Sequence, residues 1–497
     1  MLSARMQTRS RKRGDIRAGI QTEPASVWAT WQRQLGRWSG GSTAPARMLS
    51  RLKVWKSPSA ALVGGVFVAA FLSRVVWLSH APFQSDQSSV LWMALNAVRH
   101  PSVPDYGLVS SFHAFQPPGL VWVVMPFVAL GGGRPEFVIV AFGLLNASAF
   151  AFFIATALRA WGFRVAAVTA VFLVVGPDAF NSAILWHISL YTGAMALLLA
   201  AGIRLRSGSR WWALVITAIP GLYALIHYSG FVLYGSSALL LLISRRKFAD
   251  LWVPVAAAFA LTLVAWEPFL SFEMQRHWSD FTTIWHGANT DHTLRQFIAQ
   301  RYHGTWFALT HLGESIRGPV LLTPVITLLA LGALIVACVR RTAVAPVLVP
   351  TAVVAGGLAI QVATGMGHRT DVLMLWLLPL YVLAGWLLGQ VRWTAVVAVA
   401  AVAILVLGSI GLERTVNSTP TALTLSSRWA AARTKAVVYY DNTSVINALY
   451  LPCDPPWSRG AETWYLEEVI HPGDGIKAAL AANAFSARRG TCADRER

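Results

Sequence analysis

Apolar runs long enough to cross a lipid bilayer recur in this chain of 497 residues, between residue 58 and residue 412. A transmembrane helix needs about 20 consecutive apolar residues. Only 13% of the residues are charged, whereas an ordinary soluble domain carries about 25%, so this chain lacks the charge to cover a soluble surface. The sequence therefore predicts an all-α polytopic membrane protein.

Eleven of the apolar runs are predicted to span the membrane. They cover residues 58–79, 136–158, 163–177, 186–203, 211–227, 229–244, 250–269, 318–339, 344–364, 370–390 and 393–412. Basic residues gather in the connections on one side, namely Arg159, Arg164, Arg204, Arg206, Arg210, Arg245, Arg246, Lys247, Arg340, Arg341 and Arg392. The short connections on the other side hold Asp178, Asp371 and the cation Arg369. This asymmetry predicts that the basic side faces the cytoplasm.

The N-terminal segment 1–57 carries twelve basic residues against the two acids Asp15 and Glu23. This composition predicts a disordered cytoplasmic tail near anionic lipid, and it gives no reason to expect nucleic-acid binding. The segment lacks the apolar core of a cleavable signal, so we expect the first span to be retained as an anchor in the plasma (inner) membrane.

The apolar stretch 117–132 is the exception among these runs. Counting it as a span would send every later basic cluster to the outside, so the charge asymmetry predicts a non-spanning helix on the outer face. The first outer loop then covers 80–135. All 12 histidines fall in outer loops or at outer span ends, and the span middles hold no Asp, Glu or Lys. We therefore expect the polar chemistry at the outer surface and no ion relay through the bilayer.

The C-terminal region 413–497 is predicted to be a small extracytoplasmic α/β region. Residues 435–441 favour a strand and residues 474–485 a helix. An oxidising compartment would let Cys453 and Cys492 form a disulfide, whereas Cys338 is expected to be a packing residue within a span.

The first outer loop begins with Ser85 and Asp86, which can cap a helix over 87–99. An apolar stripe along this run predicts that the helix rests in the membrane interface. Asp86 is thus either a helix cap or a functional carboxylate, and His113 and Gln116 are either interfacial hydrogen-bonding residues or part of a site. The chain then turns back at Pro117 and Pro118.

This loop resembles the first external loop of the GT-C glycosyltransferases, especially the branch of protein O-mannosyltransferases and lipid A aminoarabinose transferases. The residues that carry the resemblance are the pair Asp86-Gln87 and the turn Gln116-Pro117-Pro118. Gln87 stands where relatives commonly have a second acid. The resemblance covers residues 58–412 in layout and implies a GT-C-like transmembrane domain with external juxtamembrane helices.

The resemblance also implies a function, transfer of a sugar from a polyprenyl-phosphate donor to an acceptor glycan, lipid or protein on the extracytoplasmic side. Asp86 would be the catalytic base of an inverting single displacement. Arg369 would hold the lipid phosphate, although it could also be an interfacial anchor paired with Asp371. His113, Gln116, Glu267 and His368 are further candidates for substrate binding.

The second large outer loop, 267–317, is rich in acids, histidines and aromatic residues. No tight metal-ligand motif occurs in it, so we expect no obligatory metal, with a divalent cation as an option. Two alternatives to a transferase stay open. One is a flippase or transporter of a lipid-linked glycan, and the other is a non-catalytic relative that binds glycolipid, which the absence of a second acid keeps open.

Overall fold

The computed structural model describes residues 58–81, 85–108, 114–176, 178–181, 184–244, 246–282, 322–340, 345–363, 374–418, 436–440, 462–468 and 485–490. The chain divides into two units, Met1–Ala60 and Ala61–Arg497. The predicted basic tail 1–57 lies outside the described residues. Residues 58–60 of the first unit begin a helix that continues into the second unit. The predicted domain boundaries stay a prediction.

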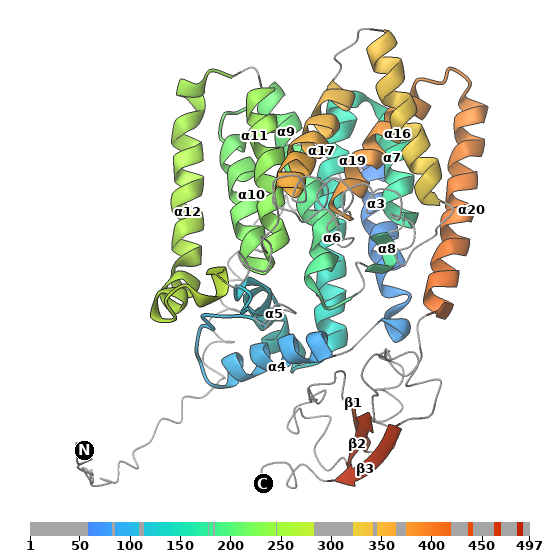
Figure 1. Cartoon of the computed structure of the whole chain (residues 1–497). Coiled ribbons are helices and arrows are strands. Elements are labelled where there is room, and N and C mark those ends of the chain that lie inside the picture. Colours follow the sequence, from blue (N-terminus) through green and yellow to red (C-terminus); the bar gives the residue numbers. More distant parts are fainter. Residues whose placement is uncertain are drawn as a thin grey trace, which may run out of the picture. The chain divides into compact units, whose positions relative to one another are not determined.

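Each of the eleven predicted spans coincides with a helix in the described part of the chain (Figure 1). These helices are α3 (Pro58–Val75), α6 (Pro135–Trp161), α7 (Phe163–Val175), α9 (Tyr191–Ser207), α10 (Trp212–Ile226), α11 (Leu233–Leu242), α12 (Phe248–Gln275), α16 (Leu322–Val339), α17 (Ala345–Ala363), α19 (Leu377–Gly389) and α20 (Thr394–Ser418). Short 3-10 turns precede three of them: η3 (His187–Leu190), η4 (Tyr228–Val232) and η6 (Met374–Trp376). Within the described residues, five helices are long and apolar enough to cross a membrane, and the others are shorter apolar helices.

Helix α9 lies at the centre of the helical bundle. In the most apolar stretch of η3 and α9 taken together, 78% is buried inside the protein. The corresponding share is 22% for α12 and 17% for α3. Its neighbours include α6, α10, α17 and α19. A helix that is apolar all round and buried on every side is a core helix, whereas α3 and α12 leave most of their apolar surface exposed.

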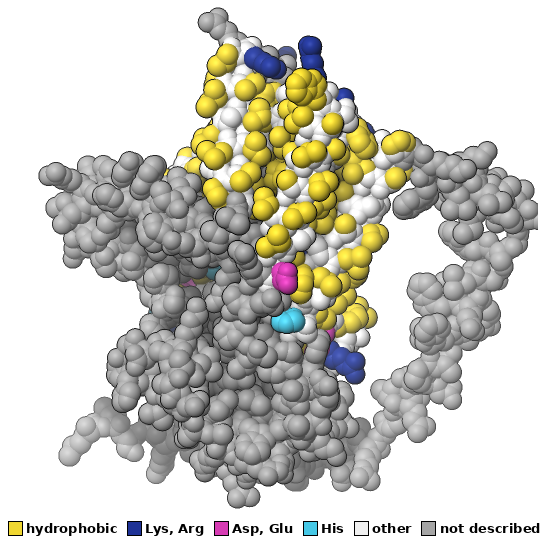
Figure 2. Space-filling view, turned by 90° about the vertical axis from the view of Figure 1, so that its right-hand side faces the viewer, with side chains coloured by type: hydrophobic (Ala, Val, Ile, Leu, Met, Phe, Trp, Pro, Cys, Tyr) yellow, Lys and Arg dark blue, Asp and Glu magenta, His cyan; other side chains and the backbone are white. Residues whose placement is uncertain are grey.

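The exposed apolar surface is broad, as Figure 2 shows, with most of the visible Lys and Arg side chains at its upper end. On α16 and α20 the exposed side chains include Leu328, Leu331, Ile335, Val396, Val399 and Val402. Contiguous apolar surface of this kind marks a surface that lipid covers. Cys338 of α16 is also exposed, so it is not the packing residue that the sequence predicted.

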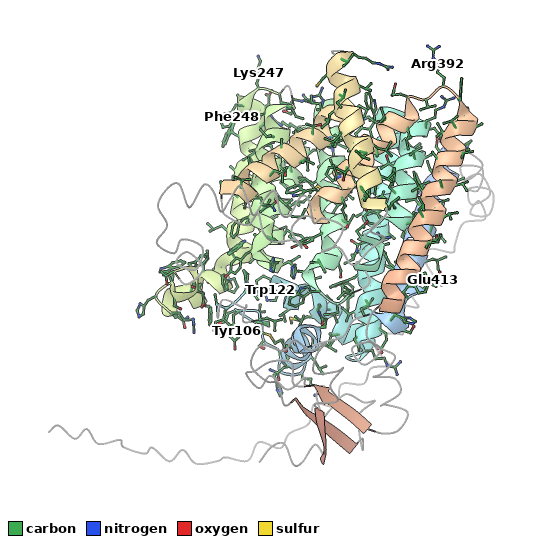
Figure 3. The ribbon with its side chains drawn as sticks, turned by 45° about the vertical axis from the view of Figure 1, so that its right-hand side comes forward. Tyr106, Trp122, Lys247, Phe248, Arg392 and Glu413 are labelled. Carbon is green, nitrogen blue, oxygen red and sulfur yellow. The ribbon has the colours of Figure 1, made fainter. Side chains whose placement is uncertain are left out.

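The two ends of the bundle differ in the residues they carry. Lys247 and Arg392, both predicted to lie on the cytoplasmic side, are found at one end of the bundle, and Tyr106 and Trp122 of the first outer loop lie toward the opposite end (Figure 3). This arrangement agrees with the sidedness that the basic residues predict. Which end faces the cytoplasm stays a prediction.

Helices α11 and α17 pack closely against each other at two glycines. A Cβ added at Gly235 would collide with the backbone oxygen of Gly356, and one added at Gly356 would collide with the backbone oxygen of Gly235. Ser236 Oγ donates a hydrogen bond to the Val353 carbonyl oxygen over 2.6 Å in the same contact. Small residues let membrane helices pack backbone to backbone in this way.

A three-stranded sheet forms from strands near the C-terminus. Strand β2 (Glu462–Glu468) pairs in parallel with β1 (Ala436–Tyr440), Ala436 opposite Glu462, and antiparallel with β3 (Phe485–Gly490), Thr463 opposite Gly490. Strand β1 lies within the run 435–441 that was predicted to be a strand. The predicted helix 474–485 lies outside the described residues except for Phe485, where β3 begins. Cys453 and Cys492 also lie outside them.

Candidate functional site

Two helices of the first outer loop form a layer beside the bundle, α4 (Ser85–Arg99) and α5 (Gly119–Gly131). They pack on each other and on α6 through a buried apolar cluster that includes Val90, Leu91, Ala94, Leu120, Val124 and Ile139. The predicted apolar stripe of α4 is therefore the buried face. Helix α5 contains Pro126 and has only 13 residues, about 20 Å at 1.5 Å per residue. Helices α7 and α19, which are predicted to span, are equally short, so the non-spanning role of α5 stays a prediction.

Asp86 is the second residue of α4, because the helix begins at Ser85. It therefore belongs to the first helical turn, where a carboxylate interacts favourably with the helix dipole, and its side chain lies outside the description. Gln87, which follows it, is buried with 8% of its surface exposed. The side chain at position 87 thus faces the interior.

The limb 114–118, the short segment that leads from this loop into α5, is held by hydrogen bonds between backbone groups. The Gly107 amide donates to the Gln116 carbonyl oxygen and the Gln116 amide donates to the Leu108 carbonyl oxygen, each over 2.7 Å. Trp122 Nε1 donates to the Pro104 carbonyl oxygen over 2.9 Å. A Cβ at Gly119 would lie 2.6 Å from the carbonyl oxygen of Leu225, so only glycine allows α5 to begin directly against the end of α10.

The same limb touches the outer end of α12. The Arg276 guanidinium lies 4.8 Å from the ring centroid of Phe115 and 5.2 Å from that of Phe272. Tyr106 packs against both rings, with centroids 4.9 Å apart in each case. Tyr228 Oη donates to the Phe115 carbonyl oxygen over 2.8 Å. Residues 115–116 are therefore held from three sides.

Two acids are buried at this end of α12. Glu273 has 0% of its surface exposed and Asp280 has 2%. Arg276 reaches Asp280 with both Nε and Nη2 at 3.4 Å. Glu273 interacts electrostatically with Asp280 and Arg276, but neither of its carboxyl oxygens has a hydrogen-bond partner of acceptable geometry. Two buried carboxyl groups thus lie beside one partly exposed guanidinium.

A second polar cluster joins the outer ends of α9 and α10. The imidazole rings of His187 and His227 stack with centroids 3.7 Å apart and an interplanar angle of 3°. His227 Nδ1 accepts from the Ser229 amide over 3.2 Å, which assigns the proton of a neutral ring to Nε2. Ser229 Oγ lies 2.8 Å from the same Nδ1 and 2.6 Å from Tyr191 Oη. Both imidazoles are buried.

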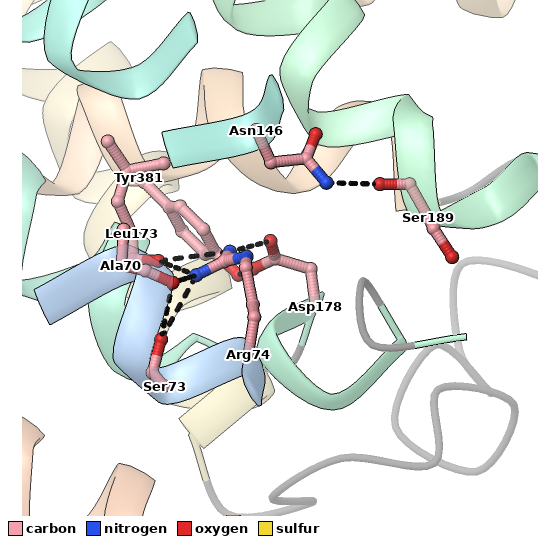
Figure 4. A network of polar contacts seen from close by, with 8 residues as sticks. All are labelled: Ala70, Ser73, Arg74, Asn146, Leu173, Asp178, Ser189 and Tyr381. Carbon is pink, nitrogen blue, oxygen red and sulfur yellow. Dashed lines mark hydrogen bonds and ion pairs between the residues drawn. The ribbon is translucent and has the colours of Figure 1, made fainter. Parts of the chain in front are cut away.

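A third cluster ties α3 to α19 through the short helix α8 (Asp178–Asn181) and is drawn in Figure 4. Arg74 Nη2 donates to Asp178 Oδ2 over 3.1 Å, and both side chains are 0% exposed. Tyr381 Oη donates to Asp178 Oδ1 over 2.7 Å. Arg74 also donates to the carbonyl oxygens of Ala70 and Leu173 over 3.1 Å and 3.3 Å. The buried ion pair and its extra hydrogen bonds thus connect α3, α7, α8 and α19.

The site residues predicted from sequence are distributed unevenly over this arrangement. Gln116 lies in the fixed limb and is half-buried. Glu267 is exposed on α12 and accepts a hydrogen bond from Ser271 Oγ over 2.9 Å. His113, His368 and Arg369 lie outside the described residues. The assignment of these residues to a site stays a prediction.

Sequence reasoning did not single out Arg74, Glu273 and Arg276, which the structure places in buried or clustered positions. Arg74 sits inside an apolar run, and a cation within a predicted span is the signal that could have drawn attention to it. Glu273 and Arg276 carry no such signal, since they resemble their charged neighbours in the same loop. Within the described residues, no group of three or more His, Cys, Asp or Glu side chains could hold a metal ion.

Two solved structures resemble this fold, both of ArnT from Cupriavidus metallidurans. The structure bound to undecaprenyl phosphate matches with a TM-score of 0.50 at 15% sequence identity, over 85% of this chain and 87% of that chain. The structure in the apo state matches with a TM-score of 0.47 at 13% identity, over 86% and 96% of the two chains. No family model and no curated protein sequence matches the chain. The first likeness shows an ArnT-like, GT-C-like fold, and the apolar helices agree with a multi-pass membrane protein.

Proposed function

We propose that this protein is a membrane glycosyltransferase that uses a polyprenyl-phosphate sugar and acts on the extracytoplasmic side. The observation that carries the proposal is the shared fold with ArnT bound to undecaprenyl phosphate, over 85% of this chain. Within the GT-C glycosyltransferases, the proposed branch is that of the lipid A aminoarabinose transferases. The molecule that accepts the sugar is a glycan, a lipid or a protein.

The distribution of polar groups supports this proposal. A lipid-linked sugar keeps its tail in the bilayer and its phosphate and sugar at the water boundary. The stacked histidines, the Arg74–Asp178 pair and the buried acids of α12 all lie at helix ends or connections that the basic residues predict to be extracytoplasmic. A transferase for such a donor needs its polar groups at that depth, and a protein that moves the headgroup across the bilayer needs them at mid-membrane.

The proposed reaction is a single displacement with inversion at the anomeric carbon. The acceptor oxygen forms a bond to this carbon while the bond from the carbon to the phosphate oxygen breaks, and the leaving lipid phosphate takes the electron pair. Asp86 accepts the proton of the acceptor hydroxyl. Arg369 stabilises the charge that develops on the phosphate, and His113, Gln116, Glu267 and His368 contribute to substrate binding.

The test uses the full chain in nanodiscs with a panel of polyprenyl-phosphate sugars, and it measures release of polyprenyl phosphate and sugar transfer. Asp86→Asn should reduce turnover by about 100-fold or more, the contribution of a general base, while donor binding persists. Asp105→Asn, in the same loop, is the matched control and should keep its turnover.

Each alternative function predicts a different result. A flippase would move labelled lipid-linked glycan between leaflets with no release of polyprenyl phosphate, and Asp86→Asn would leave it unaffected. A non-catalytic glycolipid-binding protein would bind the donor and turn over none of the panel. Retention of the anomeric configuration in the product would contradict the single displacement.

A further inference from the structure

Three charged side chains, those of Arg276, Glu273 and Asp280, lie where the first outer loop contacts the end of α12. The Arg276 guanidinium packs over the rings of Phe115 and Phe272, which also contact each other, and it contacts the Asp280 carboxylate. The side chain of Arg276 is 39% exposed, whereas that of Asp280 is 2% exposed. The cation therefore sits at the rim of the contact, and the acid lies beneath it.

The ring contacts hold the guanidinium, and the acid fixes its orientation. A cation over an aromatic face is attracted by the ring quadrupole, by about 0.5–1 kcal/mol at exposed sites and about 2 kcal/mol when water is excluded. A planar guanidinium that reaches one carboxylate with two nitrogens is also restricted in rotation. Arg276 consequently connects α12 to Phe115 in one defined geometry.

Glu273 adds a second acid beneath the same cation. A buried carboxylate with no hydrogen-bond partner is costly, and two adjacent carboxyl groups do not readily both ionise. Protonation of Glu273 would remove this cost.

This contact controls the position of Gln116. Phe115 is held by Arg276 through its ring and by Tyr228 through its carbonyl oxygen, 2.8 Å from Tyr228 Oη. The next residue is pinned by the paired hydrogen bonds to Gly107 and Leu108. Movement of the Phe115 ring would therefore displace Gln116, one of the residues assigned above to substrate binding.

We propose that Arg276 is a positioning residue of the transferase site, which clamps the limb 114–118 of the first outer loop onto the end of α12 and so places Gln116 against the substrate. Asp280 holds the guanidinium of Arg276 in its orientation. This inference rests on the proposed function for its kinetic consequence but on the observed contacts for the clamp itself.

The first measurement is amide hydrogen exchange in nanodiscs, which needs no substrate. Arg276→Gln should speed exchange of the Gly107 and Gln116 amides by about 3- to 30-fold, the range of a cation–π contact. Arg276→Lys keeps a cation but loses the planar fork, so it should give an intermediate value. The control Arg134→Gln removes an exposed arginine near the start of α6 and should change neither amide. Unchanged exchange in Arg276→Gln overturns the clamp.

The second measurement is the kinetics of transfer with the substrates that the wild type uses. Arg276→Gln should raise KM by about 3- to 30-fold with little change in kcat, and Arg276→Lys should recover part of the loss. Faster exchange with an unchanged KM would overturn the positioning role. If the wild type transfers no sugar, the proposed function fails, and the exchange of Gly107 and Gln116 still decides whether the clamp exists.

Discussion

Removal of the buried cation Arg74 is expected to be among the most destabilising single substitutions in this fold. In Arg74→Met the Asp178 carboxylate loses its guanidinium and keeps the hydrogen bond from Tyr381 Oη at 2.7 Å. Breaking a buried ion pair from one side costs about 3–5 kcal/mol, because it leaves a charge without compensation. The Phe150 ring, 4.7 Å from the guanidinium carbon, would also lose its cation.

The double substitution separates the charge term from the loss of packing. Asp178→Asn alone should cost a similar amount, since it leaves Arg74 uncompensated. Arg74→Met with Asp178→Asn should cost less than the sum of the two by about 1–3 kcal/mol, the usual coupling between residues in direct contact. Tyr381→Phe removes one hydrogen bond to a charged acceptor and should cost about 1.5–3 kcal/mol.

The assay is denaturant unfolding of the purified protein in detergent, followed by tryptophan fluorescence. Arg159→Met serves as the control, because Arg159 is exposed in the last turn of α6 and its removal should change the free energy of unfolding by about 1 kcal/mol or less. If Arg74→Met behaves like Arg159→Met, or if the double substitution shows no coupling, the reasoning from burial is refuted.

Two further predictions concern packing and charge. Gly356→Ala should destabilise the protein, because the new Cβ meets the backbone of Gly235. Gly65→Ala, with nothing within 4 Å of the added Cβ, should be neutral or slightly stabilising. Thermal unfolding in detergent compares the two variants, and equal midpoints would contradict the close helix contact. Glu273→Gln should raise the free energy of unfolding at neutral pH by about 1–3 kcal/mol, because the amide donates to Asp280 without a buried charge. Glu267→Gln, exposed on the same helix, should change it by about 0.5 kcal/mol or less, and a loss of stability in Glu273→Gln would show that the carboxylate is satisfied.

The positions of the helices were predictable from the sequence because burial in lipid requires long apolar runs. All eleven predicted spans coincide with helices in the described part of the chain. The apolar stretch 117–132 likewise predicted a helix, and the structure shows the helix Gly119–Gly131 there, while its non-spanning role stays a prediction. Both predictions rest on local composition, which does not depend on how the helices pack.

The partners of the charged residues were not predictable in the same way. Arg74 and Asp178 are 104 residues apart in the chain and meet only when α3 and the short helix α8 come together in the fold. Glu267 and Glu273 look alike in the sequence, yet six residues along a helix turn the side chain by about 120° from the first position. One is exposed and the other is fully buried.

The sequence by itself determined that this is a multi-pass membrane protein and where its helices lie. These properties follow from hydropathy and charge, which act residue by residue along the chain. Only the tertiary structure decided which polar groups are buried together, namely Arg74 with Asp178, His187 with His227, and Glu273 with Asp280. Such pairs depend on the rotation and contact of whole helices, and that geometry is set by packing across long distances in sequence.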